Sequence, residues 1–268
     1  MRSGCEVRGS RQVKIHPTAI VHPDAVLGEG VEVGPWALIE GTVKIGDRTK
    51  IGPRVTLEGH TTIGAENEIF TGAVIGSRTQ DKKFDGGKSY LKIGDRNSIR
   101  EYVTINPGTL EGTETVIGDG NLLMAYAHVA HDCIIHSGAT LANNATLAGH
   151  VTVEDKAIIG GLSAVHQFVR IGKLSITGGC SKVVQDIPPF MMVDGHPAKA
   201  FGVNAVGLDR AEFSPEEKSN IKKAFKIVFR SGLILKNIIK MIKQEIPSSP
   251  SMQTLIEFLE KSERGICG

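Results

Sequence analysis

Histidine and aspartate gather in one short segment of this chain. His128, His131 and Asp132 stand within residues 127–133, and His150 and His166 follow further along. A neutral imidazole can take a proton from an attacking hydroxyl near neutral pH, and an adjacent carboxylate can orient and support the ring. The segment therefore predicts general-base chemistry, with His131 as the base and Asp132 as its partner.

Two plainer interpretations stand beside that one. For any single histidine, a surface position on a corner of the fold is the commoner explanation. A zinc site of three histidines is a further alternative, because imidazole nitrogen is a usual zinc ligand. The presence of Asp132 and the lack of a third ligand at metal-site spacing disfavour zinc. We therefore expect no metal.

A six-residue period decides where these side chains lie. Aliphatic residues occupy every sixth position over residues 15–75, and the same phase resumes over 93–105 and 117–171. This period fits neither the 3.6-residue helix nor simple strand alternation. It predicts a mainly β fold, a parallel β-helix whose aliphatic ladders point inward and whose coils contact only their neighbours.

The coil length brings separate parts of the chain together. Three six-residue repeats would close one triangular coil of about 18 residues. His131 falls between the ladder positions Val129 and Ile135, so it should face outward. Gly149 then stacks on His131 one coil later, where its N–H could approach a developing oxyanion. Glycines after ladder residues, as at Gly46, are expected to supply the freedom in φ that a tight corner needs.

Two polar segments interrupt the period, at residues 77–92 and 106–116. The aliphatic phase survives both, so we expect each to replace whole turns of the stack. Insertions in a solenoid project from one face, and loops often carry chemistry. These segments are candidate walls of a site, with ornamental surface loops as the alternative.

Composition narrows the setting. The chain has 268 residues, 40% hydrophobic and 5% aromatic content, and a formal net charge of +2. This charge predicts no general affinity for nucleic acid or membrane. The four cysteines lack metal or disulfide spacing, which suggests reduced thiols and a cytoplasmic location. No apolar run approaches the length that spans a bilayer, so no stable membrane insertion is expected.

Three parts of the chain differ in pattern. Residues 1–12 are expected to be a loose lead-in, residues 13–187 the β-helix, and residues 188–268 a linker and a C-terminal α-helical domain. Ser214, Pro215 and Glu217 form a capping box that should begin a helix, and Ser231-Gly232 should end it. Two further helices are expected at residues 233–245 and 252–262.

The repeat resembles the hexapeptide acyltransferase family, which implies a left-handed coil and a homotrimer with sites in the clefts between subunits. Four strings carry a closer resemblance, to the acyl-ACP:UDP-N-acetylglucosamine O-acyltransferases of lipid A biosynthesis. They are HVAHDC at residues 128–133, LANNATLAGH at 141–150, AVHQF at 164–168 and GGCS at 178–181. This resemblance runs from near Ile15 into the helical tail.

The resemblance implies transfer of an (R)-3-hydroxyacyl chain from acyl carrier protein to the 3-hydroxyl of UDP-N-acetylglucosamine, the first step of lipid A biosynthesis, without a cofactor. It implies that His131 is the general base, Asp132 its partner and Gly149 the oxyanion contact. Gly179 matches an acyl-chain ruler, where a small residue implies a chain on the order of 14 carbons. The substrate-binding positions that it implies are Gln80, Asp81, Lys83, His128, His150, His166, Gln167, Asn204 and Arg210.

Departures from the family pattern leave several points open. Asn106-Pro107 stands where the family often has His-Arg, and Val206 and Ala211 stand where it often has Glu and a second Arg. Nucleotide contacts could therefore differ, and the acceptor could be the 3-amino analogue of the sugar. Acyl length and the surface that docks the carrier protein also stay open.

Other functions are weaker alternatives. The related glucosamine N-acyltransferase normally carries an N-terminal uridine-binding domain, for which the repeats beginning by Ile15 leave no room. A CoA-dependent acetyltransferase is suggested only by residues 195–199. A noncatalytic scaffold or ice-binding solenoid would not need His131, Asp132 and two polar loops together.

Overall fold

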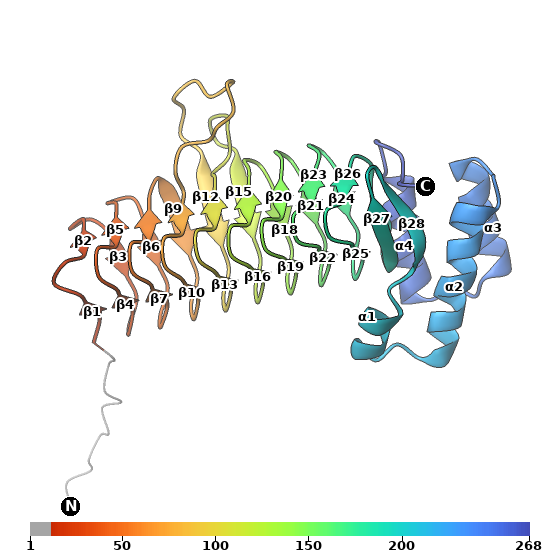
Figure 1. Ribbon diagram of the computed structural model, residues 1–268, viewed down its shortest axis with the longest axis horizontal. Coiled ribbons are helices and arrows are strands. Elements are labelled where there is room, and N and C mark those ends of the chain that lie inside the picture. The colour runs from red at the N-terminus through yellow and green to blue at the C-terminus, as the bar shows by residue number, and fades with distance from the viewer. Residues whose placement is uncertain (1–11) are drawn as a thin grey trace, which may run out of the picture.

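The protein is described by a computed structural model, and the description below is of residues 12–268. Residues 1–11, most of the expected lead-in, lie outside the described residues. The described chain winds into a long stack of coils, and a group of helices lies beside the last coils (Figure 1). Each coil contributes short strands to three parallel sheets, so the predicted parallel β-helix is confirmed.

The three sheets are called A, B and C. The strands of sheet A, in spatial order, are β1 (Lys14–Ile15), β4 (Glu32–Val33), β7 (Lys50–Ile51), β10 (Glu68–Ile69), β13 (Ser98–Ile99), β16 (Leu122–Leu123), β19 (Thr140–Leu141), β22 (Ile158–Ile159), β25 (Ile176–Thr177), β27 (Met191–Gly195) and β28 (Ala198–Val203). The strands of sheet B are β2 (Ile20–Val21), β5 (Leu38–Ile39), β8 (Thr56–Leu57), β11 (Val74–Ile75), β14 (Thr104–Ile105), β17 (His128–Val129), β20 (Thr146–Leu147), β23 (Ala164–Val165) and β26 (Lys182–Val183). The strands of sheet C are β24 (Arg170–Ile171), β21 (Thr152–Val153), β18 (Ile134–Ile135), β15 (Glu114–Ile117), β12 (Tyr90–Ile93), β9 (His60–Ile63), β6 (Lys44–Ile45) and β3 (Val26–Leu27).

The inward ladders form the core. Almost every predicted ladder residue from Val33 to Ile171 is at most a few per cent exposed, with smaller buried residues such as Val31, Ala37 and Val43 two positions earlier. Ile15 belongs to the first coil and is 47% exposed, because no described coil packs against its outer side. Burial of these aliphatic side chains stabilises the stack by roughly 1.5–3 kcal/mol for each fully buried residue.

Each polar segment lengthens one coil, and the two coils are different. This corrects the expectation that each segment replaces whole turns. Regular coils pair residues 18 apart, as Lys14 pairs with Glu32. Ile69 pairs with Ile99 and Ile99 with Leu123, separations of 99 − 69 = 30 and 123 − 99 = 24 residues. Residues 76–89, here loop 1, and residues 106–113, here loop 2, are therefore insertions between sheets B and C. They project from the same side of the stack (Figure 1).

Most glycines after ladder residues have a different role from the one expected, although Gly76, with φ +83°, does use a left-handed backbone. At Gly46, Gly52 and Gly118 the backbone does not adopt a positive φ, whereas Arg48 and Arg54, two residues after the first two of these glycines, do. A Cβ at Gly46 would lie 2.6 Å from the backbone of Gly64 in the next coil. Glycine is required there because successive coils approach closely, and other residues form the corner.

The solenoid does not stop at Pro188-Pro189, where the sequence pattern ends. Strand β27 pairs in parallel with β25 and then turns back as the antiparallel strand β28, so sheet A extends to Val203. This hairpin was not predicted, because its strands lack the six-residue period. A division of the chain between residues 187 and 188 stays a proposal.

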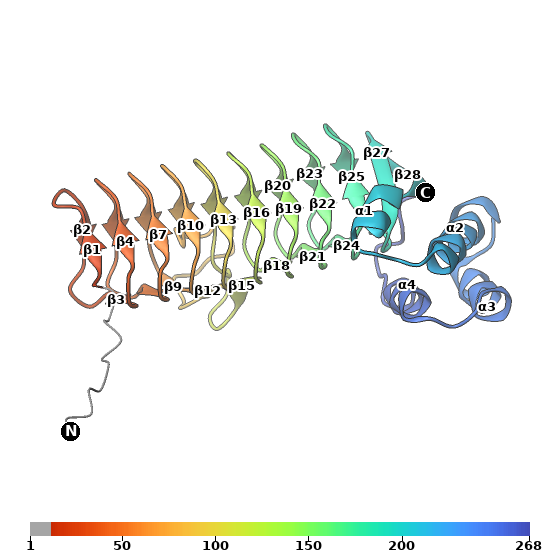
Figure 2. The ribbon, with the colours of Figure 1, turned by 90° about the horizontal axis from the view of Figure 1, so that it is seen from below.

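Four helices follow: α1 (Ala205–Arg210), α2 (Pro215–Arg230), α3 (Leu235–Glu245) and α4 (Pro250–Glu260). The predicted capping box at Ser214 is confirmed, with Glu217 as its partner. Helices α2, α3 and α4 pack around Ile221, Ile242 and Leu255 at the end of the stack (Figure 2). In the part of the chain that is described, no helix is both long and apolar enough to cross a membrane.

Candidate functional site

His131 and Asp132 form a corner between β17 of sheet B and β18 of sheet C. The corner requires a left-handed backbone at Asp132, whose φ is +58°. Aspartate tolerates this conformation better than most residues do. The N–H of Asp132 donates to the Thr115 hydroxyl at 2.8 Å, which ties the corner to the coil before it. The structure thus holds the main chain of the pair while both side chains face outward.

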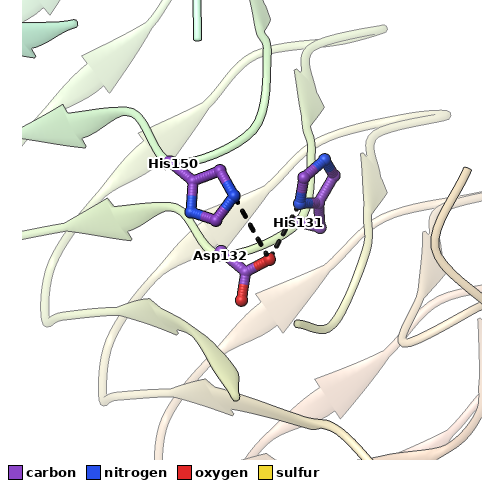
Figure 3. Close-up of side chains that lie close together, drawn as sticks. All are labelled: His131, Asp132 and His150. Atoms are coloured by element: carbon purple, nitrogen blue, oxygen red, sulfur yellow. Dashed lines mark hydrogen bonds and ion pairs between the residues drawn. The ribbon is translucent and has the colours of Figure 1, made fainter. Parts of the chain in front are cut away.

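The His131 imidazole lies between two carboxylates. Its Nδ1 is 2.8 Å from Asp132 Oδ2, and its Nε2 is 3.6 Å from Asp81 Oδ2 (Figure 3 shows the Asp132 contact). The His131 and Asp132 side chains are only 15% and 10% exposed. A hydrogen on Nδ1 would donate to the Asp132 carboxylate, which leaves the Nε2 lone pair free to accept a proton.

The next coil places Gly149 directly on this ring, as predicted. A Cβ at residue 149 would lie 2.3 Å from His131 Cε1, so only glycine fits without moving the imidazole. Within residues 12–268 the structure gives the Gly149 N–H no hydrogen-bond partner. This amide is available to a ligand beside His131.

His150 follows Gly149 and lies against the same pair. Its N–H donates to the His131 carbonyl at 3.0 Å, and its Nε2 is 3.9 Å from Asp132 Oδ2. Its ring stacks on Phe168 with centroids 4.6 Å apart and planes 8° from parallel. Sequence reasoning missed Phe168, although its place one coil after His150 could have indicated the contact. A cavity of about 670 Å³ opens beside these two rings, lined also by Arg170 and Arg264.

The two inserted loops close the other side of the site. Loop 1 supplies Asp81, while its neighbours Gln80 and Lys83 are exposed and have no side-chain hydrogen bond to the described chain. Loop 2 supplies the N–H of Thr109, which donates to Asp132 Oδ2 at 3.2 Å. Thr109 and Thr115 were missed, because nothing in the sequence shows which loop threonine reaches a carboxylate.

His128 lies on β17, partly buried, with its Nδ1 2.7 Å from the Thr104 hydroxyl. Burial lowers the pKa of His128, and the nearby His131 lowers it further by charge repulsion. A neutral His128 can exchange hydrogen bonds with a hydroxyl. His166 and Gln167 are exposed one coil beyond Gly149, and His166 Nδ1 lies 3.3 Å from the Gln167 carbonyl oxygen.

Three candidate residues lie away from His131 in this chain. Asn204 caps α1: its side chain accepts from the Gly207 N–H at 2.9 Å and donates to the Leu174 carbonyl at 2.8 Å. Arg210 is exposed at the end of that helix. Gly179 is exposed on the corner between sheets A and B. One copy of the chain therefore does not bring these residues to the histidine site.

A metal could find ligands at the same corner. Ligand atoms of His131, Asp132 and His150 all lie within 4.8 Å of one another. Imidazole nitrogen and carboxylate oxygen suit zinc. However, Asp132 Oδ2 already accepts from the Thr109 N–H and contacts His131 Nδ1. The donor set suits an ion, while its hydrogen bonds suit a base and its orienting carboxylate equally well.

The chain is similar to known proteins over most of its length. Residues 114–149 match a family model described as bacterial transferase hexapeptide (six repeats), and residues 186–267 match one described as Udp N-acetylglucosamine O-acyltransferase, Domain 2. An acyl-[acyl-carrier-protein]–UDP-N-acetylglucosamine O-acyltransferase from a Janthinobacterium species is 50% identical over 257 residues, which are 94% of this chain and 98% of the relative.

Solved structures agree. LpxA from Acinetobacter baumannii has a TM-score of 0.92 and 43% identity, covering 95% of this chain and 99% of that one. LpxA from Bacteroides fragilis, described as a UDP-N-acetylglucosamine acyltransferase, has a TM-score of 0.92 and 41% identity over 95% and 100% of the two chains. The predicted left-handed parallel β-helix with C-terminal helices is confirmed. The chain belongs to the family of acyl-[acyl-carrier-protein]–UDP-N-acetylglucosamine O-acyltransferases.

Proposed function

We propose that this protein transfers an (R)-3-hydroxyacyl group from acyl carrier protein to the 3-hydroxyl of UDP-N-acetylglucosamine, the first step of lipid A biosynthesis. The observation that carries this proposal is the His131 imidazole, hydrogen-bonded to Asp132 through Nδ1 and packed against Gly149, whose N–H has no partner among residues 12–268. A base beside an oxyanion donor is what direct acyl transfer to a hydroxyl requires.

The proposed reaction needs no covalent enzyme intermediate. His131 Nε2 takes the proton of the sugar hydroxyl while its oxygen forms a bond to the thioester carbonyl carbon. The Gly149 N–H donates to the negative oxygen of the tetrahedral intermediate. The carbon–sulfur bond then breaks, and the imidazolium gives its proton to the departing thiolate. Asp132 supports the positive ring between these two proton transfers.

Substrate-binding roles are proposed for the remaining candidates. Asp81 lies beside Nε2, where it can accept a hydrogen bond from a sugar hydroxyl. His128 and His150 flank the same corner, and Gln80 and Lys83 extend from loop 1 into solvent. Gln167 and His166 lie at the same edge of the stack one coil after Gly149, where they would contact the acyl chain or the nucleotide of a substrate. Gly179 would leave space for a chain on the order of 14 carbons.

A homotrimer is part of the proposal. Asn204 contacts the corner at Leu174, between sheets C and A, and Arg210 ends the helix that Asn204 caps, whereas His131 lies between sheets B and C. A neighbouring copy would therefore have to supply a nucleotide contact to each site. Large side chains are exposed along the corner between sheets A and B, and such patches mark interfaces. They are Trp36, Tyr102, Tyr126 and Leu162.

The cytoplasm is the proposed location. The described cysteines Cys133, Cys180 and Cys267 are all free thiols. Burial raises the pKa of Cys133 and of Cys267 to about 12, so neither thiol is poised to react. Unpaired cysteines are typical of a reducing compartment.

The test is transfer from 3-hydroxymyristoyl acyl carrier protein to UDP-N-acetylglucosamine, measured for the wild type and for His131→Ala. We expect turnover by the wild type and a loss on the order of 100- to 10,000-fold in the variant. His136→Ala is the matched control, because this exposed histidine has no side-chain hydrogen bond to the described chain.

Each possible result of this assay bears on a separate part of the proposal. Activity retained in a folded His131→Ala protein would refute the base. A wild type that acts only on the 3-amino sugar would move the proposal to that acceptor. Chain-length assays peaking at ten carbons would overturn the assignment of acyl length. No turnover with either acceptor at any chain length would overturn the proposed function.

A further inference from the structure

The two inserted loops meet through a pair of buried threonine hydroxyls. Thr79 of loop 1 and Thr109 of loop 2 are 5% and 3% exposed, and their Oγ1 atoms lie 3.2 Å apart. Buried hydroxyls in proteins are nearly always hydrogen-bonded, and these two satisfy one another. Contact between two loops at this depth is specific, because each threonine must reach across from its own insertion.

Each threonine also contacts a residue that flanks His131. The Asp81 N–H donates to the Thr79 hydroxyl at 3.2 Å. The Thr109 N–H donates to Asp132 Oδ2, also at 3.2 Å. Since Asp81 and Asp132 lie on opposite nitrogens of the imidazole, the contacts run in a closed ring around it.

We propose that Thr79 and Thr109 are positioning residues for the transfer reaction. Their hydroxyl contact, here called the lock, joins the two loops and so fixes both carboxylates against His131. This proposal rests on the proposed function, in which His131 is the base. Neither threonine touches the imidazole, and each acts through the aspartate that it holds. Their shared hydroxyl contact sets the separation of Asp81 from Asp132.

The contact between the threonines matters because the Asp132 side chain has few other restraints, the His150 Nε2 being 3.9 Å from its Oδ2. Its main chain is held by the Thr115 hydroxyl, and its Oδ2 accepts from Thr109 while contacting His131 Nδ1. Without the Thr109 amide in place, the carboxylate can rotate away from Nδ1. The ring would then lose the partner that keeps its hydrogen on Nδ1 and its lone pair on Nε2.

On the other side, the lock keeps Asp81 near the reacting nitrogen. Asp81 Oδ2 lies 3.6 Å from His131 Nε2, too far for a strong hydrogen bond and close enough to orient an entering hydroxyl. Asp81 Oδ1 accepts from the Lys83 N–H at 3.0 Å, so the carboxylate moves with loop 1. A shift of that loop would misdirect the acceptor without removing any group from the site.

Loss of the hydroxyl pair should leave the loops folded, because other bonds hold them. Asn106 of loop 2 donates to the Ser77 carbonyl at 3.0 Å. The Gly112 N–H donates to the Lys88 carbonyl at 2.7 Å, and the Gly108 N–H donates to the Tyr90 carbonyl at 3.2 Å. The positioning role can therefore be separated from folding.

The experiment compares Thr79→Val, Thr109→Val and the double variant with the wild type. Valine keeps the branched shape and removes the hydroxyl. We expect kcat to fall about tenfold in each single variant, with KM for UDP-N-acetylglucosamine within about twofold of the wild type. The double variant should fall no further than Thr79→Val, because that change already breaks the one contact that Thr109→Val removes, together with the bond from the Asp81 N–H.

Two matched variants control this result. Thr109→Ser keeps the hydroxyl and should restore most of kcat. Thr113→Val removes a hydroxyl from the same loop, but one whose hydrogen bonds to the described chain all go to Leu110, so kcat should stay near the wild-type value. Imidazole ¹⁵N shifts of His131 should show one tautomer in the wild type and a mixture in Thr109→Val, a change that a purely structural role would not cause.

Several results would overturn the positioning role. They are kcat unchanged in both valine variants, losses that multiply in the double variant, Thr109→Ser as slow as Thr109→Val, or an unchanged His131 tautomer. If His131→Ala is inactive while both valine variants are normal, only the positioning role fails. If His131→Ala is fully active, the proposed base fails as well, so the two failures are distinguishable.

Discussion

Two corners of the solenoid each contain one residue with a left-handed φ, and they differ in what they do. At the corner between sheets C and A, Asp119 comes just before Gly120, whose φ is +63°. The Asp119 carboxylate accepts a hydrogen bond of 2.8 Å from the N–H of Asp95, which lies in the preceding coil. At the corner between sheets B and C, His131 precedes Asp132 with φ +58°. In this second corner the carboxylate belongs to the left-handed residue itself, one position later than in the first corner.

That shift of one residue changes the partner of the carboxylate. Just before the left-handed residue of the corners between sheets C and A, an acidic or hydroxyl side chain accepts a backbone N–H from the preceding coil. The residues that do so are Asp47, Asp95, Asp119, Ser137 and Asp155. At the second corner, Asp132 turns toward the imidazole and loop 2 instead. Left-handed corners of one solenoid thus hold the stack in one row and hold the proposed base in another.

The largest expected difference between the two kinds of corner comes from replacing one glycine at each kind with alanine. Gly149→Ala places a Cβ 2.3 Å from His131 Cε1, so the imidazole must move. We expect kcat to fall on the order of 1,000-fold, because the base and the oxyanion contact are both displaced. Gly118→Ala instead meets the Ser137 hydroxyl and the His136 backbone at 2.8–3.0 Å, which should lower stability by roughly 1–3 kcal/mol and leave kcat near wild type.

The measurements are steady-state transfer kinetics and urea unfolding of both variants. Equal loss of kcat in the two proteins would remove the distinction between a structural and a chemical corner. Loss of stability in Gly149→Ala without loss of kcat would show that the ring tolerates displacement.

A smaller difference should follow from removing one charge at each corner. Asp132→Asn keeps the size and tolerates the positive φ, but it cannot support an imidazolium as a carboxylate does. We expect kcat to fall on the order of 100-fold. Asp119→Asn should leave kcat unchanged and cost about 1 kcal/mol of stability, because it weakens one hydrogen bond to the backbone. Full activity in Asp132→Asn would refute the partnership with His131.

Sequence alone predicted the repeated parts well and the exceptional parts poorly. The aliphatic period identified the buried ladder and the stacking of Gly149 on His131, since both follow from a fixed coil length. The β27–β28 hairpin escaped notice because its residues carry no such period. The contacts of Asp81 with His131 and of Thr79 with Thr109 depend on how two irregular loops fold toward each other, which no local pattern encodes.

The smallest predicted effect concerns pH and His128. Burial lowers its folded-state pKa below the usual 6.5, so the unfolded chain binds a proton that the folded protein does not. Stability is therefore fully present above about pH 6.5 and declines as pH falls through that value. Urea unfolding at fixed protein concentration should show a shallower decline for His128→Asn than for the wild type. The exposed His136→Asn should keep the wild-type slope, and identical slopes in all three proteins would contradict the burial argument.

The way in which the insertions enter the stack has a consequence for how their lengths can change. Loop 1 and loop 2 each lengthen one coil, and the strands on either side pair in register as if nothing had been added. The aliphatic ladder is therefore continuous across both insertions. The two loops instead constrain each other, through the Thr79–Thr109 contact, so a change of length in one is expected to require a matching change in the other while the coils beneath stay as they are.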